Sequence, residues 1–301
     1  MKIIILGCGY LGYNLTNYLS QWYPKLICIG NEGSYSALMY QRFTSVNVFD
    51  QERLARIDFE DAIVLDTIAL LDNHAHSDQE EKVLQELKIK YSLLLKQLKE
   101  KRIRRYIFIS SGAVYGNTNQ PADESQLVSP MNLYARSKVM VEQLIEQGSL
   151  DYLILRLASP YGGFRMTDKR QGVIPILIEK ALDHQPFEML KEKTTIRDYF
   201  YISDFAQAIK LLLEYEVSNE IINVGSGKGY SLASIIDVVK RTTGESVIVC
   251  KTEPEVVILD KIVLNVDKLR QRTGFDCEIG ITSGVYRELD RIRTDRNRGK
   301  K

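Results

Sequence analysis

The chain has 301 residues, of which 45% are hydrophobic and 26% are charged. This composition excludes a largely disordered chain and allows one large or two modest cores. The formal net charge of +1 gives no electrostatic reason to expect nucleic acid or an anionic membrane surface as a partner.

No cationic leader with an apolar core opens the sequence, and no apolar run reaches about 18 residues. We therefore expect a cytoplasmic protein without a signal peptide or a membrane span. The four cysteines have no paired spacing and are expected to be reduced. His74 and His76 have no acidic or cysteine companion at ligand spacing, so the sequence predicts no metal site.

The first predicted element is a β-branched strand over residues 2–6, which stops at a glycine-rich loop and leads directly into a helical pattern. In this context the glycines let backbone N–H groups approach a pyrophosphate at the helix N-terminus. The alternative is a tight strand-to-helix turn without a ligand. The residues predicted to bind a dinucleotide here are Gly7, Gly9, Tyr10, Leu11 and Gly12.

The second predicted strand, residues 26–29, ends at Gly30, Asn31 and Glu32. An acidic residue at this point normally binds the ribose diol of NAD. Gly30 occupies the strict position, but Glu32 lies two residues later, and no basic residue follows until Arg42. We therefore predict that Asn31 and Glu32 help to bind NAD, with NADP kept as the alternative.

The following segments alternate between strand and helix patterns, which is typical of a parallel sheet. They comprise strands at 43–49, 61–65, 106–109 and 151–157, and an amphipathic helix at 80–101.

The strand at 106–109 is followed by Ser110 and Ser111, a loop, and a helix in which Tyr134 and Lys138 are four residues apart. This spacing puts both side chains on one helix face. A phenol ionises near pH 10, but a nearby ammonium favours the phenolate and lowers its pKa. Tyr134 can then act as a general acid or base, with Ser111 passing the proton to or from a substrate oxygen. A solvated helix face is the alternative for such a pair.

Strand and helix patterns alternate less regularly in the second half of the chain. We interpret this half as a smaller mixed lobe over the carboxyl edge of the sheet. The predicted domains are a dinucleotide-binding Rossmann domain at 1–165, to which the chain returns near 195–225, a substrate lobe at 166–290 and a flexible basic tail at 291–301. The predicted elements of the lobe are a helix at 172–182, an extended segment at 187–190, a strand at 197–202, a helix capped by Ser203 or Asp204, a turn at 223–227, a helix from Ser231 to Thr243, and a last short helix from Asp267.

Together these motifs resemble the extended short-chain dehydrogenase/reductase family, in its nucleotide-sugar epimerase/dehydratase branch. The resemblance covers nearly the whole chain. It is carried by the glycine loop at 7–12, the Ser-Ser-Gly-Ala-Val-Tyr-Gly run at 110–116, Tyr134 to Lys138, Leu155-Arg156 with Ser159 to Gly162, the run at 197–201 and the turn at 223–227.

The resemblance implies an α/β fold, a doubly wound Rossmann-type parallel sheet with a smaller mixed C-terminal substrate lobe. It implies NAD(P) as the cofactor and Ser111, Tyr134 and Lys138 as the catalytic set, with Tyr134 and Lys138 also contacting the cofactor. It further implies a homodimer joined through helices 80–101 and 134–147, and a nucleoside-diphosphate sugar as the substrate. The residues that it assigns to that sugar are Ser159, Gln171, Val173, Phe187 and Arg197.

Several positions depart from the family pattern. The glycine loop is one residue tighter than usual, and Asn47 stands where an Asp usually contacts adenine, although an amide can still bond there. Ser159 replaces a frequent Asn. Val256 and Val257 stand where an Arg often binds the diphosphate, which leaves Arg197 as the matching cation and puts the identity of the substrate in question.

The residues after Ser111 separate the possible reactions. Dehydratases of this family place an Asp-Glu pair there, whereas this chain has Gly112 and Ala113, which cannot exchange protons. Our leading interpretation is NAD-dependent C4 epimerisation of a UDP-type sugar. One alternative is an NAD(P)H-dependent reductase of a nucleotide-linked 4-keto sugar, which would complete a deoxysugar for a surface polysaccharide. The alternative from another class is a non-enzymatic NAD(P)-binding regulator.

Overall fold

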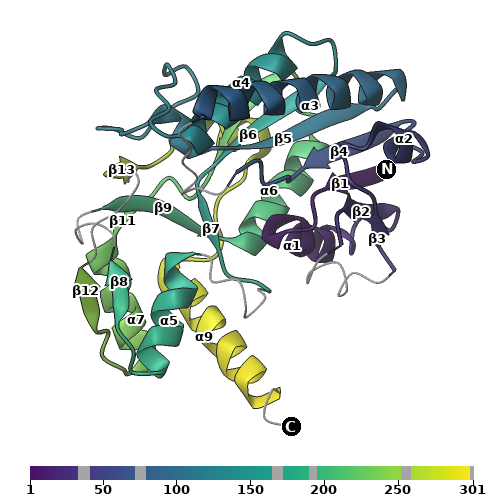
Figure 1. Cartoon of the computed structure of the whole chain (residues 1–301). Coiled ribbons are helices and arrows are strands. Elements are labelled where there is room, and N and C mark those ends of the chain that lie inside the picture. The colour runs from purple at the N-terminus through teal and green to yellow at the C-terminus, as the bar shows by residue number, and fades with distance from the viewer. Residues whose placement is uncertain (33–40, 72–78, 165–171, 190–194, 252–258, 299–301) are drawn as a thin grey trace.

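The computed structural model describes residues 1–32, 41–71, 79–164, 172–189, 195–251 and 259–298. At its centre is a parallel seven-stranded sheet with the strand order β10-β6-β5-β4-β1-β2-β3 (Figure 1). This order confirms the predicted doubly wound, Rossmann-type fold. The strands are β1 (Lys2–Leu6), β2 (Leu26–Gly30), β3 (Phe43–Ser45), β4 (Ala62–Asp66), β5 (Arg105–Ser111), β6 (Tyr152–Leu157) and β10 (Glu220–Val224).

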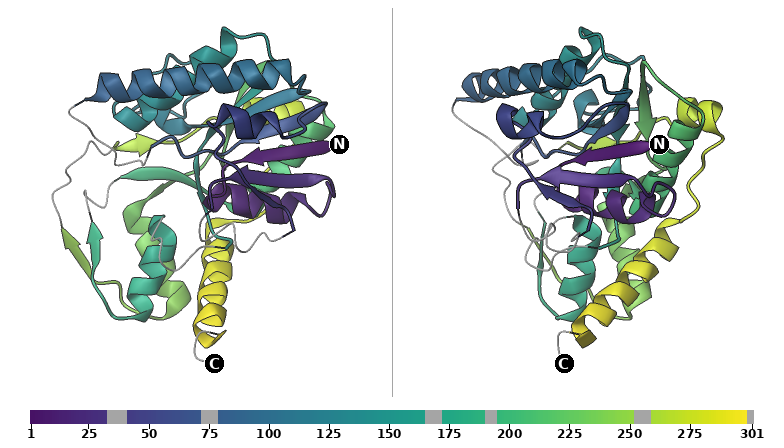
Figure 2. Two further views of the ribbon diagram at one scale, coloured as in Figure 1. Left: turned by 45° about the vertical axis from the view of Figure 1, so that its right-hand side comes forward. Right: turned by 90° about the vertical axis from the view of Figure 1, so that its right-hand side faces the viewer.

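Helices cover both faces of this sheet, which is why β1, β4 and β5 are almost continuously apolar and buried. One face packs against α1 (Tyr10–Leu19) and α6 (Ile202–Glu214). The other packs against α2 (Gln51–Ala55), α3 (Glu80–Glu100) and α4 (Leu133–Glu146). Figure 2 shows α3 along the outer side of the molecule, away from the smaller part of the structure.

The smaller part lies beyond the carboxyl ends of the strands (Figure 1). Its main sheet is built on β9 (Ile196–Tyr201), which pairs with β7 (Ser159–Tyr161), β11 (Gly229–Ser231) and β13 (Lys261–Ile262). A second pair joins β8 (Phe187–Met189) to β12 (Val249–Lys251). Besides α6, the helices of the second half are α5 (Val173–Leu182), α7 (Leu232–Thr243), α8 (Asp267–Thr273) and α9 (Ile281–Arg298). A short 3-10 helix, η2 (Gly112–Tyr115), follows β5.

The C-terminus differs from the prediction of a flexible basic tail. Helix α9 runs to Arg298, so α8 is not the last helix and residues 291–298 are helical. The reason is an apolar face at helical spacing, on which Val285, Leu289 and Ile292 are all buried. In Figure 1 this helix extends from the smaller part of the molecule toward the C-terminus.

Two further predictions need correction. The strand expected over 43–49 is only three residues long, because the backbone turns at Asn47, whose carbonyl accepts the N–H of Asp50. Helix α6 begins at Ile202 with Tyr201 as its N-cap, so Ser203 and Asp204 lie in its first turn. The predicted Ser231 cap is confirmed, since its hydroxyl accepts the Ser234 N–H at 3.1 Å.

Within the described part of the chain, no helix combines the length and apolar character needed to cross a bilayer.

Candidate active site

The glycine loop lies at the carboxyl end of β1, where the strand order of the sheet reverses between β1 and β4. Gly7 has φ +99°, a conformation that favours glycine, and a Cβ on Gly12 would lie 1.9 Å from the Gly7 carbonyl oxygen. By contrast, a Cβ on Gly9 would meet no described protein atom within 4 Å. Gly7 and Gly12 thus close the turn, and Gly9 leaves open space at the start of α1.

This open space suits an anion. Gly9 is the N-cap of α1, and no described side chain caps the helix. The first turn of α1 also contains no acidic residue, so its positive dipole end is not offset there. The arrangement therefore fits the pyrophosphate of a dinucleotide. The predicted residues Tyr10 and Leu11 form the first turn and are half-buried.

The start of α1 is joined to the loop after β7. The Tyr10 hydroxyl donates to the Gly162 carbonyl at 2.7 Å. One turn later, the Asn14 amide donates to the Phe164 carbonyl at 2.8 Å and accepts the Phe164 N–H at 2.9 Å. Gly163 has φ +71°, and a Cβ there would lie 2.5 Å from Asn14 Oδ1. Any other residue at position 163 would therefore disturb the bonds between Asn14 and Phe164.

The predicted ribose-binding residues Asn31 and Glu32 are exposed at the carboxyl end of β2. Asn47 is also exposed, and its side-chain oxygen accepts the Phe49 N–H at 3.0 Å. Arg42 points elsewhere, because its guanidinium donates to the carbonyls of Pro24 and Leu26, at the opposite end of β2. The structure therefore places Glu32, and not Arg42, where β2 ends.

The two serines at the end of β5 have different surroundings. The Ser110 hydroxyl is buried and donates to Glu142 of α4. The Ser111 hydroxyl is half-buried and accepts the Ala113 N–H at 3.2 Å, which caps η2. Only Ser111 therefore remains near the surface of the sheet's carboxyl edge. This difference agrees with the choice of Ser111 over Ser110, and the role of Ser111 stays a prediction.

Helix α4 presents the predicted pair. Asn132 caps it by accepting the Ala135 N–H at 2.8 Å, which fixes where the helix begins. Tyr134 follows in the first turn and is half-buried, whereas Lys138 is only 5% exposed. Nζ of Lys138 lies 5.9 Å from the centroid of the Tyr134 ring. The structure thus brings together the phenol and the ammonium that the spacing predicted.

The Lys138 ammonium is enclosed by protein. It donates to the Ile109 carbonyl at 2.7 Å and lies 4.7 Å from the centroid of the Phe108 ring. Burial lowers the pKa of Lys138 to about 8, against the opposing influence of Asp66 and Glu142, whose charges favour the ammonium. Lys138 therefore loses its proton near pH 8, below the usual range of a lysine.

Glu142, one turn after Lys138, is paired inside the protein. Arg156 Nη2 of β6 lies 2.7 Å from its carboxylate, and both side chains are almost fully buried. The Arg156 guanidinium also lies 4.8 Å from the Tyr115 ring centroid, and the Tyr115 hydroxyl donates to Asn223 at 2.9 Å. These contacts join α4, β6, η2 and β10 behind the candidate site. Burial raises the pKa of Tyr115 to about 12, so this phenol stays protonated.

The residues predicted to bind substrate are spread over the smaller part. Ser159 begins β7 and pairs in register with Tyr199 of β9, the strand that also carries Arg197. Val173 is the half-buried first residue of α5, and Phe187 is buried in the core. Gln171, Val256 and Val257 lie outside the described residues, as do His74 and His76. The structure thus places Ser159 and Arg197 on adjacent strands.

Arg197 is held by the backbone. Its guanidinium donates to the carbonyls of Leu259 at 2.6 Å and Asp260 at 3.3 Å, and to the Ile196 carbonyl at 2.8 Å. Burial lowers its pKa, with Tyr199 and Asp260 opposing the shift. An anion that bound this side chain would therefore compete with these carbonyls.

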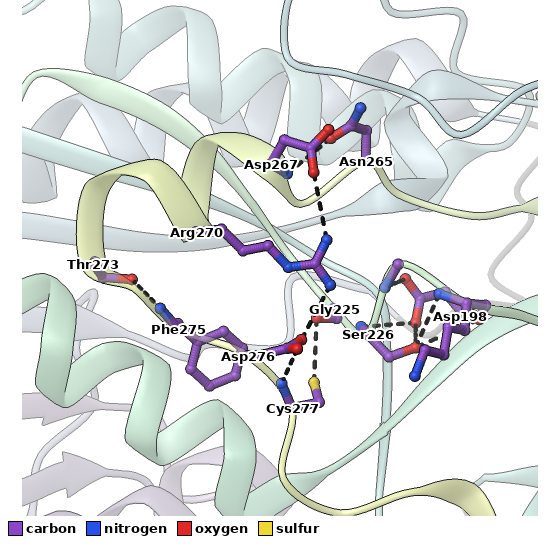
Figure 3. Close-up of polar contacts among 12 residues, drawn as sticks. Asp198, Gly225, Ser226, Asn265, Asp267, Arg270, Thr273, Phe275, Asp276 and Cys277 are labelled. Carbon is purple, nitrogen blue, oxygen red and sulfur yellow. Dashed lines mark hydrogen bonds and ion pairs between the residues drawn. The ribbon is translucent and has the colours of Figure 1, made fainter.

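The neighbouring Asp198 anchors β9 to the turn after β10 (Figure 3). One carboxylate oxygen accepts the N–H and the hydroxyl of Ser226 at 2.9 and 2.5 Å, and the other accepts the Gly227 N–H at 3.0 Å. The Cys277 thiol donates to the Gly225 carbonyl at 3.4 Å on the other side of the turn. The motif at 223–227 thus serves to fix the strand that carries Arg197.

Sequence reasoning did not identify Asp66 as part of this region. Asp66 ends the buried strand β4 and accepts hydrogen bonds from the hydroxyls of Tyr91 and Tyr106. A single acidic residue at the end of an otherwise apolar strand was the available signal. The two tyrosines come from α3 and β5, so their convergence on Asp66 depends on the tertiary structure.

A protein-family model described as the NAD dependent epimerase/dehydratase family matches residues 3–225. A dTDP-4-dehydro-6-deoxyglucose reductase of Escherichia coli is 30% identical over 203 residues, which cover 66% of this chain and 64% of the reductase, just under two thirds of its length. A putative UDP-glucose 4-epimerase of Methanocaldococcus jannaschii is 26% identical over 302 residues, which cover 96% of this chain and 97% of that protein.

A crystal structure of the Thermus thermophilus UDP-glucose 4-epimerase in complex with NAD has the same fold. It superimposes with a TM-score of 0.87 over 97% of this chain and 99% of the epimerase, at 22% sequence identity.

Proposed function

Because the chain belongs to the NAD dependent epimerase/dehydratase family, we propose that it interconverts the C4 epimers of a nucleoside-diphosphate sugar. The observation that carries this proposal is the pairing of Tyr134 with the enclosed ammonium of Lys138 at the carboxyl edge of the sheet. Family membership also confirms the prediction of NAD as the cofactor.

The position of Arg42 supports NAD over NADP. Its guanidinium is bound to carbonyls at the amino end of β2, whereas the ribose side of a Rossmann site lies at the carboxyl end, next to Glu32. Bound NAD would supply reversible hydride transfer at C4 of the sugar. The residues proposed to hold it are the glycine loop with Tyr10 and Leu11, together with Asn31, Glu32, Asn47, Tyr134 and Lys138.

Within the site, Tyr134 is proposed to remove the proton of the C4 hydroxyl and later to return it. The positive charge of Lys138 favours the phenolate form of Tyr134. Ser111 is proposed to donate a hydrogen bond to the same sugar oxygen and so to orient it. Arg197 is proposed to bind the diphosphate through its guanidinium, in exchange for some of the backbone carbonyls to which it donates in this structure.

Dehydration is disfavoured by the space around Gly112. A Cβ there would lie 3.1 Å from a Leu264 methyl group and 3.3 Å from an Ile262 methyl group, so both groups would have to shift by a few tenths of an ångström to admit a side chain. Ala113, the next residue, has no titratable group. The chain therefore lacks the acidic pair that elimination of water would use.

The proposal is tested by the ultraviolet spectrum of the purified protein before and after addition of UDP-glucose or UDP-galactose. We expect retained dinucleotide that is transiently reduced, with conversion of the sugar to its C4 epimer and no consumption of added cofactor. Tyr134→Phe is the matched control, which should retain dinucleotide without reducing it. A site that takes up no dinucleotide, or retains NAD and converts none of the nucleotide sugars, would contradict the proposal.

A second candidate is reduction of a nucleotide-linked 4-keto sugar. It is favoured by the relative with 30% identity, which is named as a reductase of such a sugar. This reaction uses the same three residues, and its product would be a deoxysugar for a surface polysaccharide. Oxidation of added NADH or NADPH that depends on a 4-keto sugar, with no epimerisation, would favour it. Tight dinucleotide binding without either reaction would favour the non-enzymatic regulator.

We also propose a homodimer formed through α3 and α4, which pack side by side. On α3, Ile89 is 52% exposed and Leu93, one turn later, is 47% exposed. On α4, Met140 and Leu144 are half-buried and also apolar. We propose that these side chains belong to one apolar strip, which a second copy of the chain would remove from water.

A further inference from the structure

A carboxylate is buried beside the candidate catalytic lysine. Asp66, the last residue of β4, is 1% exposed and pairs in register with Phe108 of β5. The Lys138 ammonium lies over the Phe108 ring and donates to the carbonyl of the next residue, Ile109. Asp66 of β4 therefore lies opposite the residues of β5 that the Lys138 ammonium contacts.

Three donors fix the Asp66 carboxylate. One oxygen accepts the Ile68 N–H at 2.8 Å, and the other accepts the hydroxyls of Tyr91, at 3.2 Å, and Tyr106. Donors on both oxygens favour the ionised carboxylate, which only accepts hydrogen bonds. Burial raises the pKa of Asp66, whereas these donors and the charge of Lys138 oppose that shift.

The groups facing Lys138 come from several elements. Asp66 faces it from β4, and Glu142 and Tyr134 come from its own helix. Tyr91 of α3 and Tyr106 of β5 reach this region through Asp66. Glu142 is already paired with Arg156 and accepts from Ser110, so its charge is largely offset. Accordingly, Asp66 favours the ammonium form of Lys138 more strongly than Glu142 does.

We propose that Asp66 is a positioning residue that keeps Lys138 in the ammonium form beside Tyr134, and that Tyr91 and Tyr106 hold Asp66 in this role. The inference rests on the proposed function, in which the charge of Lys138 makes Tyr134 an effective proton acceptor. Asp66 touches neither the sugar nor the cofactor in this account, and it acts through Lys138.

The physical consequence follows from the cost of burying an unpaired charge. A lysine enclosed by protein loses its proton readily unless a nearby negative charge compensates the lost hydration. An opposite charge within about 4–6 Å typically moves a pKa by about one to three units, and a more distant charge moves it less. Without the Asp66 charge, the pKa of Lys138 would fall below about 8.

The test is a direct titration of Lys138 in the full-length protein with Asp66→Asn. Carbon-13 labelling of the lysine Cε atoms, with the Lys138 signal assigned by Lys138→Arg, reports its pKa without any need for turnover. We expect the pKa of Lys138 to fall by roughly one unit or more in Asp66→Asn. The matched control is Asp204→Asn, because Asp204 is also buried and accepts a backbone N–H, from Ile279 at 3.2 Å. The Lys138 titration should not move in this control.

If Asp66→Asn fails to fold, Tyr106→Phe decides the matter. It removes a donor from Asp66 while conserving the volume of the ring, and we expect a smaller fall of the Lys138 pKa in the same direction. A Lys138 titration identical to the wild type in the folded variants would overturn the inference.

Turnover separates this inference from the proposed function. If nucleotide sugars are converted, the high-pH limb of the kcat profile should move to lower pH in Asp66→Asn, in parallel with the Lys138 titration. If the Lys138 pKa falls but no sugar is converted even by the wild type, the inference stands and the proposed function fails. Conversely, sugar conversion with an unmoved Lys138 titration leaves the proposed function intact and rejects the role of Asp66.

Discussion

Nζ of Lys138 lies 5.9 Å from the centroid of the Tyr134 ring, one turn further along α4. The two side chains have contrasting environments, since Tyr134 is half-buried and Lys138 is enclosed by β5. A half-buried phenol therefore lies beside a cation that is enclosed by protein.

Replacement of the phenol tests its chemical role. We expect Tyr134→Phe to lower kcat by roughly 10²-fold or more, because general acid–base catalysis typically contributes 10²–10⁴-fold. NAD should still bind, as measured by calorimetry, because the glycine loop and Lys138 are unchanged. Tyr286→Phe is the control, since Tyr286 is 63% exposed on α9 and should keep full activity. Unimpaired turnover in Tyr134→Phe would remove Tyr134 from the mechanism.

The pH dependence of activity follows from Lys138. Its pKa is lowered by burial to about 8, so the ammonium is lost as the pH rises through that value. We expect kcat to fall above about pH 8 and to recover when the pH is lowered again. The lowered pKa affects stability in the opposite direction to activity. Between about pH 8 and the ordinary lysine value of 10.5, the unfolded chain binds more protons than the folded chain, so raising the pH favours the folded chain.

The contribution of Lys138 to stability therefore increases with pH across this window. Circular dichroism recorded along the kcat profile separates the two effects. A loss of activity that coincided with unfolding would contradict this explanation.

Two glycines of the dinucleotide loop should respond differently to alanine. In Gly12→Ala the new Cβ would lie 1.9 Å from the Gly7 carbonyl, so we expect destabilisation by about 1–3 kcal/mol or misfolding. In Gly9→Ala the Cβ would meet no described protein atom, so the melting temperature should be retained and NAD affinity should fall. Thermal melts and NAD titration of both variants make the comparison. Unchanged NAD affinity in Gly9→Ala would place the pyrophosphate elsewhere.

The proposed diphosphate contact predicts a specific kinetic signature. We expect Arg197→Gln to raise KM for the nucleotide sugar by about 10- to 100-fold, the value of one or two charge-assisted hydrogen bonds. The effect on kcat should be smaller, because the contact exists in both the ground state and the transition state. Arg296→Gln is the control, as Arg296 pairs with Asp183 on the surface. Equal KM values for both variants would refute the contact.

The apolar strip of α3 predicts the oligomeric state. We expect sedimentation to show a dimer for the wild type and a monomer for the double variant Ile89→Glu with Leu93→Glu, because the charges would be buried unpaired in the interface. Ile248→Glu is the matched control, since Ile248 is 49% exposed but lies outside α3 and α4. A wild-type monomer would remove the proposed interface.

The first half of the fold could be predicted because its signals are local. The buried strands are continuous apolar runs, and the glycine loop and the Tyr134–Lys138 spacing each lie within one short segment. Helix α9 was missed although Val285, Leu289 and Ile292 have helical spacing, because the arginine-rich composition suggested a solvated end. The length of β3 could not be predicted, since its end depends on a turn at Asn47.

The motifs of the candidate site could be predicted from the sequence, but the tertiary contacts of their side chains could not. Sequence alone could not show that Ser110 is bound to Glu142, that Arg197 is held by the carbonyls of Leu259 and Asp260, or that Asp66 faces Lys138. Each of these relationships joins segments far apart in the chain. They are set by strand register and helix packing, which the residue types themselves do not specify.

The bonds from Tyr10 and Asn14 to residues 162–164 have a thermodynamic consequence. They tie the helix that would hold the cofactor to the loop that leaves β7, the strand beginning with Ser159. If binding of one ligand orders this junction, the second ligand binds without the entropic cost of ordering it. Because linkage is reciprocal, we expect NAD and the nucleotide sugar each to raise the affinity of the protein for the other by the same factor.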